Sequence, residues 1–556
     1  MKKNKISYLF LLLIGLFYSK NAFLQNVNDT FIVVKPYEPV ISDAFKIKDN
    51  PSISDTGKII PSLNYLFLNT RAIVPFSIIS IEPAKIKGEP LVKLYHSYIK
   101  AGIGNNTTPL AEIYYNSVRN KSYSFGINAK HFSSNGISNI DYSSFSENKL
   151  NIYGKKFLKR HTLYGDGFYS RNVVHYYGMD SLVSPEIIDK SGLKQNYSSF
   201  GGKVGLLSNL ADSSVYRYDI KSNYKYIYDL YNTGEHYAKI DANIGRYFDF
   251  DYYHLKTTID YNKYSSATDT LSNSIISIQP GITSMSRKWR LNVGLNITAE
   301  LANVAKFRFY PNAEFRYNLI SEIVIPYLGI TGNLKRTNFD YFVQQNPFVR
   351  SSLNLINENT RYHGYIGIRG NFSSKVSFNV AANYSQIAGM AMFVKDYSEI
   401  LRNKFDLVYD TVDVTNLRTE ISFQNREKLR FLITTDYNMF ATRNQKEVWH
   451  RPNFKANISS IYDLADKIII RLDIFGIDKQ YVRTFERVET TTGFEMVQNA
   501  VRIEGWIDAN IGIEYRYTKR ISAFVNFNNL LSKGYQRWQD YTTMRFNVLG
   551  GLTYSF

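Results

Sequence analysis

The sequence predicts an all-β fold, a transmembrane antiparallel up-and-down β-barrel of about 22 strands with a short Pro-rich N-terminal arm. Apolar and polar residues alternate in runs of about 10 to 13 residues, longer than the usual strand of a soluble protein. Short turns and longer polar links separate these runs. Tyr and Phe, 45 and 36 residues, suit an apolar band flanked by aromatic girdles. A mean hydropathy of −0.28 excludes a bundle of membrane-spanning helices.

Residues 1–25 have the composition of a signal peptide. Lys2, Lys3 and Lys5 form a basic start, residues 6–18 are mostly apolar, and Ala22 offers a small residue for cleavage. The apolar part is shorter than the roughly 20 residues that a membrane-spanning helix needs. The chain is therefore expected to be exported.

Residues 26–90 form a second region, which the prolines distinguish. Seven of the chain's 14 prolines lie here (Pro36, Pro39, Pro51, Pro61, Pro75, Pro83 and Pro90). Proline lacks an amide donor and fixes φ, so this region cannot be a run of central strands. We expect an extended arm that hangs into the periplasm or occludes a lumen.

Residues 91–556 carry the strand pattern. In residues 289–299, for example, Trp289, Val293 and Ile297 share one face, while Arg290 and Asn296 occupy the other. Short turns are expected near residues 119–121, 157–160, 249–251, 286–288, 373–374, 425–428 and 518–520. The longer links are expected at Ser134–Glu147, Val174–Asn196, Lys335–Thr360, Ile387–Asp410 and Tyr481–Ala500. Short connections on one side and long ones on the other are typical of outer-membrane barrels.

A soluble sandwich, propeller or β-helix would also alternate. The strand length, the export signal and the lack of a strict repeat of about 40 to 50 residues argue against these folds. The barrel is the better interpretation.

The last residues resemble the carboxyl end of TonB-dependent receptor barrels. The shared features are a strand ending in residues 528–531, a loop with Tyr535 and Trp538, and a closing strand, residues 544–556, that ends in an aromatic residue. The resemblance implies that Tyr554 and Phe556 lie on the lipid-facing side and serve as the signal that the barrel-assembly machinery reads. It also implies the outer membrane of a Gram-negative bacterium.

The arm departs from this family, whose globular plug exceeds a hundred residues. The chain is most similar to plug-poor, receptor-like barrels of Bacteroidota outer membranes. Within the arm, residues 30–34 resemble a TonB-contact box, with Thr30, Val33 and Val34 as candidate contacts. TonB or another envelope protein is the implied partner.

The sequence offers no catalytic or cofactor chemistry. It has no cysteine, its eight histidines form no metal-binding pair, and it has no nucleophile elbow or phosphate loop. We expect no enzyme, no metal and no cofactor. The net charge of +19 is spread along the chain, which disfavours nucleic acid and favours lipopolysaccharide and a basic lumen. The candidate lumen-facing residues are Lys130, Lys239, Arg290, Arg516 and Arg545, and solvation of a wide lumen is favoured over a substrate site as their role.

Two functions remain open. The first is transport across the outer membrane, with the arm and the link Lys335–Thr360 as occluders of the lumen. The second is a structural or accessory role in an outer-membrane assembly or secretion complex.

Overall fold

The computed structural model describes residues 94–179, 190–209, 215–302, 304–321, 323–490 and 493–556. The predicted signal peptide, the predicted arm and the candidate TonB contacts Thr30, Val33 and Val34 lie outside these residues. Within them, no helix is long and apolar enough to cross a bilayer.

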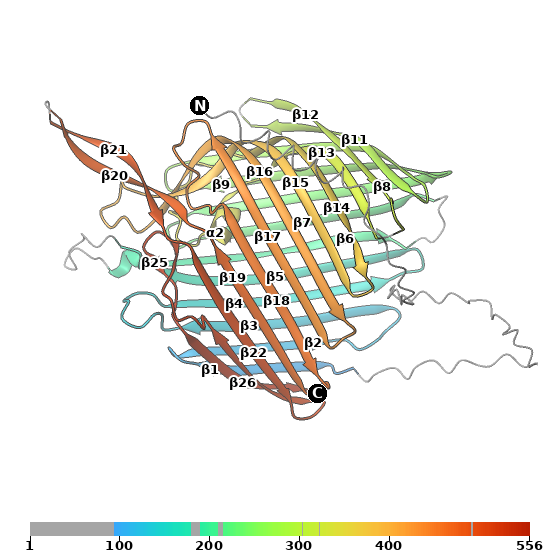
Figure 1. Ribbon diagram of the computed structural model, residues 1–556, viewed down its shortest axis with the longest axis horizontal. Helices are drawn as coiled ribbons and strands as arrows, with labels where there is room; N and C mark the ends of the chain where they lie inside the picture. The colour runs from blue at the N-terminus through green and yellow to red at the C-terminus, as the bar shows by residue number, and fades with distance from the viewer. Residues whose placement is uncertain (1–93, 180–189, 210–214, 303, 322, 491–492) are drawn as a thin grey trace, which may run out of the picture. The chain divides into compact units, whose positions relative to one another are not determined.

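A single sheet of 22 antiparallel strands forms the wall of the molecule, and Figure 1 shows its strands side by side. Each strand pairs with its neighbour in sequence, apart from two hairpins that leave the sheet. The first strand also pairs with the last, from Tyr98 opposite Ser555 to Gly104 opposite Leu549. The sheet therefore closes on itself and leaves no free edge, as a barrel in lipid requires. The predicted architecture and strand number are confirmed.

The first half of the wall contains β1 (Ser97–Gly104), β2 (Thr108–Asn116), β3 (Tyr123–Ser134), β4 (Phe145–Phe157), β5 (His161–His175), β6 (Lys194–Ser208), β7 (Arg217–Tyr228), β8 (Gly234–Phe248), β9 (Asp251–Ser265), β10 (Thr270–Met285) and β11 (Trp289–Leu301). The second half contains β12 (Lys306–Tyr317), β13 (Ile325–Lys335), β14 (Glu358–Ser373), β15 (Val376–Lys395), β16 (Phe405–Asn425), β17 (Leu429–Thr442), β18 (Phe454–Leu464), β19 (Ile468–Ile477), β22 (Trp506–Arg516), β23 (Ile521–Asn528) and β26 (Asn547–Ser555). The remaining elements belong to connections: η2 (Lys190–Leu193), α2 (Phe339–Gln345), β20 (Gln480–Thr490), β21 (Gly493–Ile503), β24 (Gln536–Trp538) and β25 (Tyr541–Thr542).

The two faces of the wall differ as the alternation predicts. On β11, Val293 is 50% exposed and Leu295 is also exposed, whereas Asn296 and Thr298 on the other face are buried. Successive side chains of a strand point to opposite faces, so the apolar set faces outward and the polar set faces the lumen. The outer face is the one that contacts lipid in a barrel of this kind.

The two rims of the barrel differ in their connections. The terminal rim holds both ends of the wall, where the amide of Ser97 donates to the carbonyl of Phe556 at 3.0 Å, and its connections have eight residues or fewer. The opposite rim, here called the loop rim, carries the long connections after β3, β5, β13, β17, β19 and β23. Four connections of the loop rim, after β1, β7, β9 and β11, are nevertheless short.

Two of the predicted long links are wrong in detail. Most of Ile387–Asp410 is strand, because β15 ends only at Lys395 and β16 already begins at Phe405. Residues 481–500 are mostly the hairpin β20–β21, which lies outside the wall and extends away from it (Figure 1). Alternation is invisible where both faces of a hairpin are covered by protein or both face water, so sequence pattern could not place these strands.

The closing strands are shorter than predicted. β23 ends at Asn528, because Asn529 has a φ of 50° and its side-chain amide donates to the carbonyls of Lys533 and Met544. Asn is one of the few residues that accept this backbone conformation readily. β26 begins only at Asn547, so Met544 and Arg545 precede the closing strand.

Candidate functional site

The connection between β13 and β14 folds against the inner wall instead of extending into solvent. We call residues 336–357 the strap. Its helix α2 begins after Asn338, whose side chain accepts a hydrogen bond from the amide of Tyr341 at 3.1 Å. Asn is a favoured residue at this position because it satisfies a free helical amide. Phe339, Phe342 and Val343 lie on one face of α2, and all three are buried.

Charged groups hold the first part of the strap to β7, β8 and β9. Arg336 pairs with Asp260 at 2.6 Å, with side chains 9% and 7% exposed. Lys225 pairs with Asp340, also at 2.6 Å. The buried carboxylate of Glu235 accepts hydrogen bonds from the amides of Phe339 and Asp340 at 2.8 and 3.2 Å. We call these contacts the ionic anchor.

Backbone and ring contacts hold the second part of the strap to β16 and to the connection before β26. The amide of Phe405 donates to the carbonyl of Phe348 at 3.0 Å, and the amide of Arg350 donates to the carbonyl of Phe405 at 2.9 Å. The rings of Phe348 and Tyr541 stack at 3.8 Å between centroids. We call these contacts the latch.

The loop-rim ends of β15 and β16 complete the cover. A register shift separates Ile387 from Met390, and Gly389 between them has a φ of 70°. An irregularity of this kind bends a hairpin. Every residue from Met390 to Lys395 is buried, so neither face of this stretch contacts lipid or open water. The strap and this overhang share one apolar cluster, which contains Tyr197, Ile227, Tyr264, Phe339, Phe342, Val343, Val349, Leu353, Ala391, Phe393, Phe405, Leu407 and Tyr541.

A cavity of about 520 Å³ lies beside the latch. We call it the aromatic chamber. Its walls come from α2, β15, β18, β19, β20, β22, β24 and the connections after β17 and β23. It is lined by Gln345, Phe393, Trp449, His450, Arg451, Pro452, Lys455, Phe475, Ile477, Gln480, Trp506, Tyr535, Arg537, Trp538 and Thr543.

Aromatic rings dominate the chamber, and three of the chain's four tryptophans line it. Trp506 and Tyr535 stack at 4.0 Å between centroids, with planes 14° apart. Phe393 meets Trp538 edge to face at 5.0 Å. The indole N–H of Trp506 is buried and has no hydrogen-bond partner within the part of the chain that the structure describes. The chamber thus offers flat apolar surfaces.

The chamber carries positive charge. Arg451, Lys455 and Arg537 line it, and its lining contains no Asp or Glu. Arg451 donates to the carbonyl of Ala391 at 3.1 Å, and burial lowers its pKa, although an arginine stays protonated at neutral pH. Among the described residues none of the three forms an ion pair, and cations on an apolar surface favour an anionic group.

His450 is a neutral part of the chamber. Burial lowers its pKa to about 4. The hydrogen bonds assign one tautomer: Nδ1–H donates to the carbonyl of Phe393 at 2.8 Å, and Nε2 accepts from the amide of Gln539 at 3.3 Å. Burial also raises the pKa of Tyr535 to about 12, and the nearby Asp508 acts in the same direction. Neither side chain changes charge near neutral pH.

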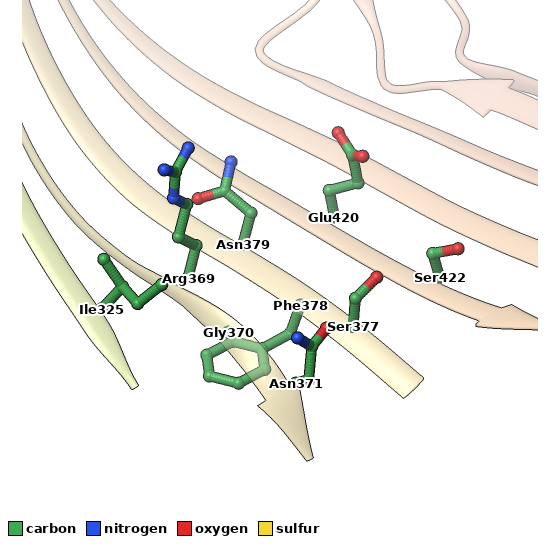
Figure 2. Close-up of a pocket in the computed structure, with 9 residues that line it drawn as sticks. All are labelled: Ile325, Arg369, Gly370, Asn371, Ser377, Phe378, Asn379, Glu420 and Ser422. Carbon is green, nitrogen blue, oxygen red and sulfur yellow. The ribbon is translucent and has the colours of Figure 1, made fainter. Parts of the chain in front are cut away.

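A second cavity, of about 480 Å³, lies near the terminal rim (Figure 2). Arg369, Asn379 and Glu420 form one row across β14, β15 and β16, because each is paired with the next in the register of the sheet. In Figure 2 their side chains extend to the same side of the sheet. This row carries both signs of charge and no tryptophan. It is therefore typical of a polar lumen wall and does not favour one class of ligand.

Four of the five predicted basic residues lie on the inner face of the wall. Lys130 on β3, Lys239 on β8, Arg290 on β11 and Arg516 on β22 lie on the face opposite the exposed apolar residues of their strands. Arg545 lies in the connection before β26 and not on a strand. Carboxylates accompany three of them: Lys130 lies 3.3 Å from Glu147, Lys239 3.2 Å from Asp241 and Arg516 3.7 Å from Glu514. The structure does not bring the five together into one site.

At the closing strand, Tyr554 is exposed on the outer face, and its ring stacks on Phe556 at 5.4 Å. That the barrel-assembly machinery recognises Tyr554 and Phe556 stays a prediction.

The basic residues of the chamber were missed from sequence. Arg451 and Arg537 lie in aromatic stretches, Trp449-His-Arg451 and Tyr535-Gln-Arg-Trp538, each within a connection of the loop rim. Aromatic and basic residues that recur together in long connections were the available signal. His450, between Trp449 and Arg451, lies in the same connection and is buried.

No protein-family model matches the chain, and no curated protein matches its sequence. Several solved structures share its fold. The FrpB iron transporter from Neisseria meningitidis superposes with a TM-score of 0.66 at 9% identity, over 84% of this chain and 82% of that one. The pyoverdine outer membrane receptor FpvA from Pseudomonas aeruginosa superposes with a TM-score of 0.62 at 12% identity, over 84% of this chain and 79% of that one. The ferric-catecholate import receptor Fiu from Escherichia coli K12 superposes with a TM-score of 0.60 at 10% identity, over 83% of this chain and 82% of that one. The chain therefore has the closed 22-stranded barrel of TonB-dependent outer-membrane receptors of Gram-negative bacteria.

Proposed function

We propose that this protein transports a solute across the outer membrane and that the aromatic chamber is where the solute first binds. The chamber beside the latch is the observation that carries this proposal, because it places a ligand-sized hollow at the covered mouth of a wide barrel. The solved structures with this fold are named as iron transporters and receptors for pyoverdine or ferric catecholates. We propose no catalytic activity.

The lining indicates the class of solute. Trp506, Tyr535 and Trp538 give flat surfaces on which a planar group can stack, and Arg451 and Arg537 attract negative charge. An anion with an aromatic part satisfies both features. Ferric complexes of aromatic chelators belong to this class.

Calorimetry on the purified barrel in detergent tests the chamber. Naphthalene-2-sulfonate is the probe, and naphthalene-2-sulfonamide is its uncharged control. We expect the anion to bind more tightly, and both Arg537→Gln and Trp506→Ala to weaken it. Arg369→Gln, in the second cavity, should leave binding unchanged. Equal binding of the two probes, or equal binding to all variants, would refute the chamber as an anion site.

The domain arrangement is part of the proposal: a signal peptide at 1–25, an arm at 26–90 and the barrel from 91. Deleting residues 26–90 should raise the conductance of the reconstituted barrel if the arm fills the lumen. A conductance that stays unchanged with and without naphthalene-2-sulfonate would place the arm elsewhere. TonB binding through Thr30, Val33 and Val34 needs a pull-down test of its own.

The accessory role remains the second candidate. The hairpin β20–β21 favours it, since it leaves the wall and exposes Met496, Val497 and Val501. A stoichiometric partner recovered from membranes with the full chain, and lost when residues 486–497 are replaced by a short Gly-Ser turn, would support this role.

A further inference from the structure

The strap reaches two nearly opposite sides of the barrel. The hydroxyl of Tyr197 on β6 donates to the carbonyl of Pro347 at 3.0 Å, and the next residue of the strap, Phe348, accepts from the amide of Phe405 on β16. In the closed ring of 22 strands, β6 and β16 are ten strands apart. The strap and the inward end of β16 therefore meet across the mouth of the lumen. A lumen of this size has to be closed by something when no solute passes.

The two attachments of the strap differ in strength. In the ionic anchor, removing either partner of Arg336 and Asp260 would leave a charge buried and unpaired, which is strongly unfavourable. The latch consists of two backbone hydrogen bonds and a ring stack. Arg350 beside it pairs with Asp396 at 3.2 Å and with Asp406 at 3.3 Å, but the arginine side chain is 32% exposed, so these pairs contribute less than the buried pair of the ionic anchor. Water can replace such backbone bonds at modest net cost. The latch is the side that can open.

The aromatic chamber adjoins the latch and not the ionic anchor. Trp538 lines the chamber, and its ring centroid lies 5.8 Å from that of Phe405. Gln345, the last residue of α2, lines the chamber too. A molecule in the chamber would thus contact both the strap and the residues that hold it.

We infer that residues 336–357 form an internal plug that is hinged at its ionic anchor and opens at its latch when an anionic aromatic solute occupies the chamber. This inference rests on the proposed function. It assigns to a loop of the barrel a gating task that is separate from any role of residues 26–90.

A disulfide across the latch tests the inference, and the chain contains no cysteine that would interfere. Val349 and Phe405 form a bridge between strap and wall, so Val349→Cys with Phe405→Cys can join the two. The control pair, Ala382→Cys with Leu417→Cys, lies opposite in register within the wall between β15 and β16. Both pairs are placed in the full chain and in the chain without residues 26–90, and each is measured in planar bilayers, oxidised and reduced.

We expect the probe naphthalene-2-sulfonate to raise the conductance of the reduced latch pair and of both forms of the control pair severalfold. Oxidation of the latch pair should abolish this rise, and a reductant should restore it. A rise that persists in the oxidised latch pair, with cross-linking verified by mass spectrometry, would overturn the inference.

A second measurement avoids any folding defect of the pair. In the single variant Phe348→Cys, the probe should accelerate labelling by a membrane-impermeant maleimide, because opening the latch exposes this position. An unchanged rate in a variant whose chamber still binds the probe by calorimetry would overturn the gate alone. If calorimetry shows no binding, the proposed function fails as well, so the two failures are distinguishable.

Discussion

The wall and the covered mouth of this barrel follow different rules. In the wall, each strand has one face toward lipid and one toward the lumen, and lumen-facing charges such as Lys130 and Glu147 remain partly exposed. At the mouth, both faces of a segment are covered, and charges such as Arg336 and Asp260 are almost fully buried. Breaking an ion pair in the wall should therefore cost less stability than breaking one at the mouth, because water screens the charges of the wall and not those of the mouth.

Arg336→Met should produce the largest effect. It leaves Asp260 buried without its partner, which costs about 3–5 kcal/mol in comparable cases. The matched wall variant Lys130→Met should cost about 0–1 kcal/mol, since its pair is exposed. Chemical unfolding of the two proteins in detergent measures both. Equal losses would remove the energetic distinction between wall and mouth.

A charge on the lipid side of the wall should come next. Val293→Arg places a guanidinium on the outer face of β11, at a cost of about 2–4 kcal/mol near the middle of a bilayer. Its neighbour Asn292→Arg places the same group in the lumen and should cost much less. Refolding yields into lipid vesicles report the difference, and similar yields would show that the two faces have been assigned wrongly.

Acid should destabilise the mouth through His450. Its pKa is about 4 in the folded protein and near 6.5 in the unfolded chain. Between these values the unfolded state binds a proton that the folded state does not, so stability is full above about pH 6.5 and falls as the pH drops toward 4. The loss is at most about 3 kcal/mol. Thermal unfolding at pH 7.5 and pH 4.5 should show a smaller drop in midpoint for His450→Gln than for the unchanged protein. An identical drop would contradict the assignment.

The smallest effect is expected at the end of the chain. Tyr554→Ala removes an outward ring that stacks on Phe556, so it should change the stability of the folded barrel little. Assembly of the protein in cells should nevertheless slow, if the machinery reads this aromatic pair. Pulse-chase measurement of folded barrel in the outer membrane checks this, with Tyr515→Ala, another exposed outer-face tyrosine, as the control.

The same distinction explains what could be predicted from the sequence. Alternation such as that of Trp289, Val293 and Ile297 records a face that contacts lipid, so strand number and closure were accessible. At Met390–Lys395 both faces are covered, and the alternation is lost. The chamber and the ionic anchor join residues from distant strands, such as Lys225 with Asp340, and only the closed ring brings them together. Composition indicated a basic lumen but not where its unpaired cations would gather.

The pairing of β1 with β26 has a consequence for biogenesis. Because the first strand has its second neighbour only when residues 547–555 have been made, the cylinder cannot close during synthesis. Until then the sheet has two edge strands whose unpaired backbone groups can form hydrogen bonds with other chains. Closure therefore comes after the whole wall has been made, and removal of β26 should yield aggregates and not a smaller pore.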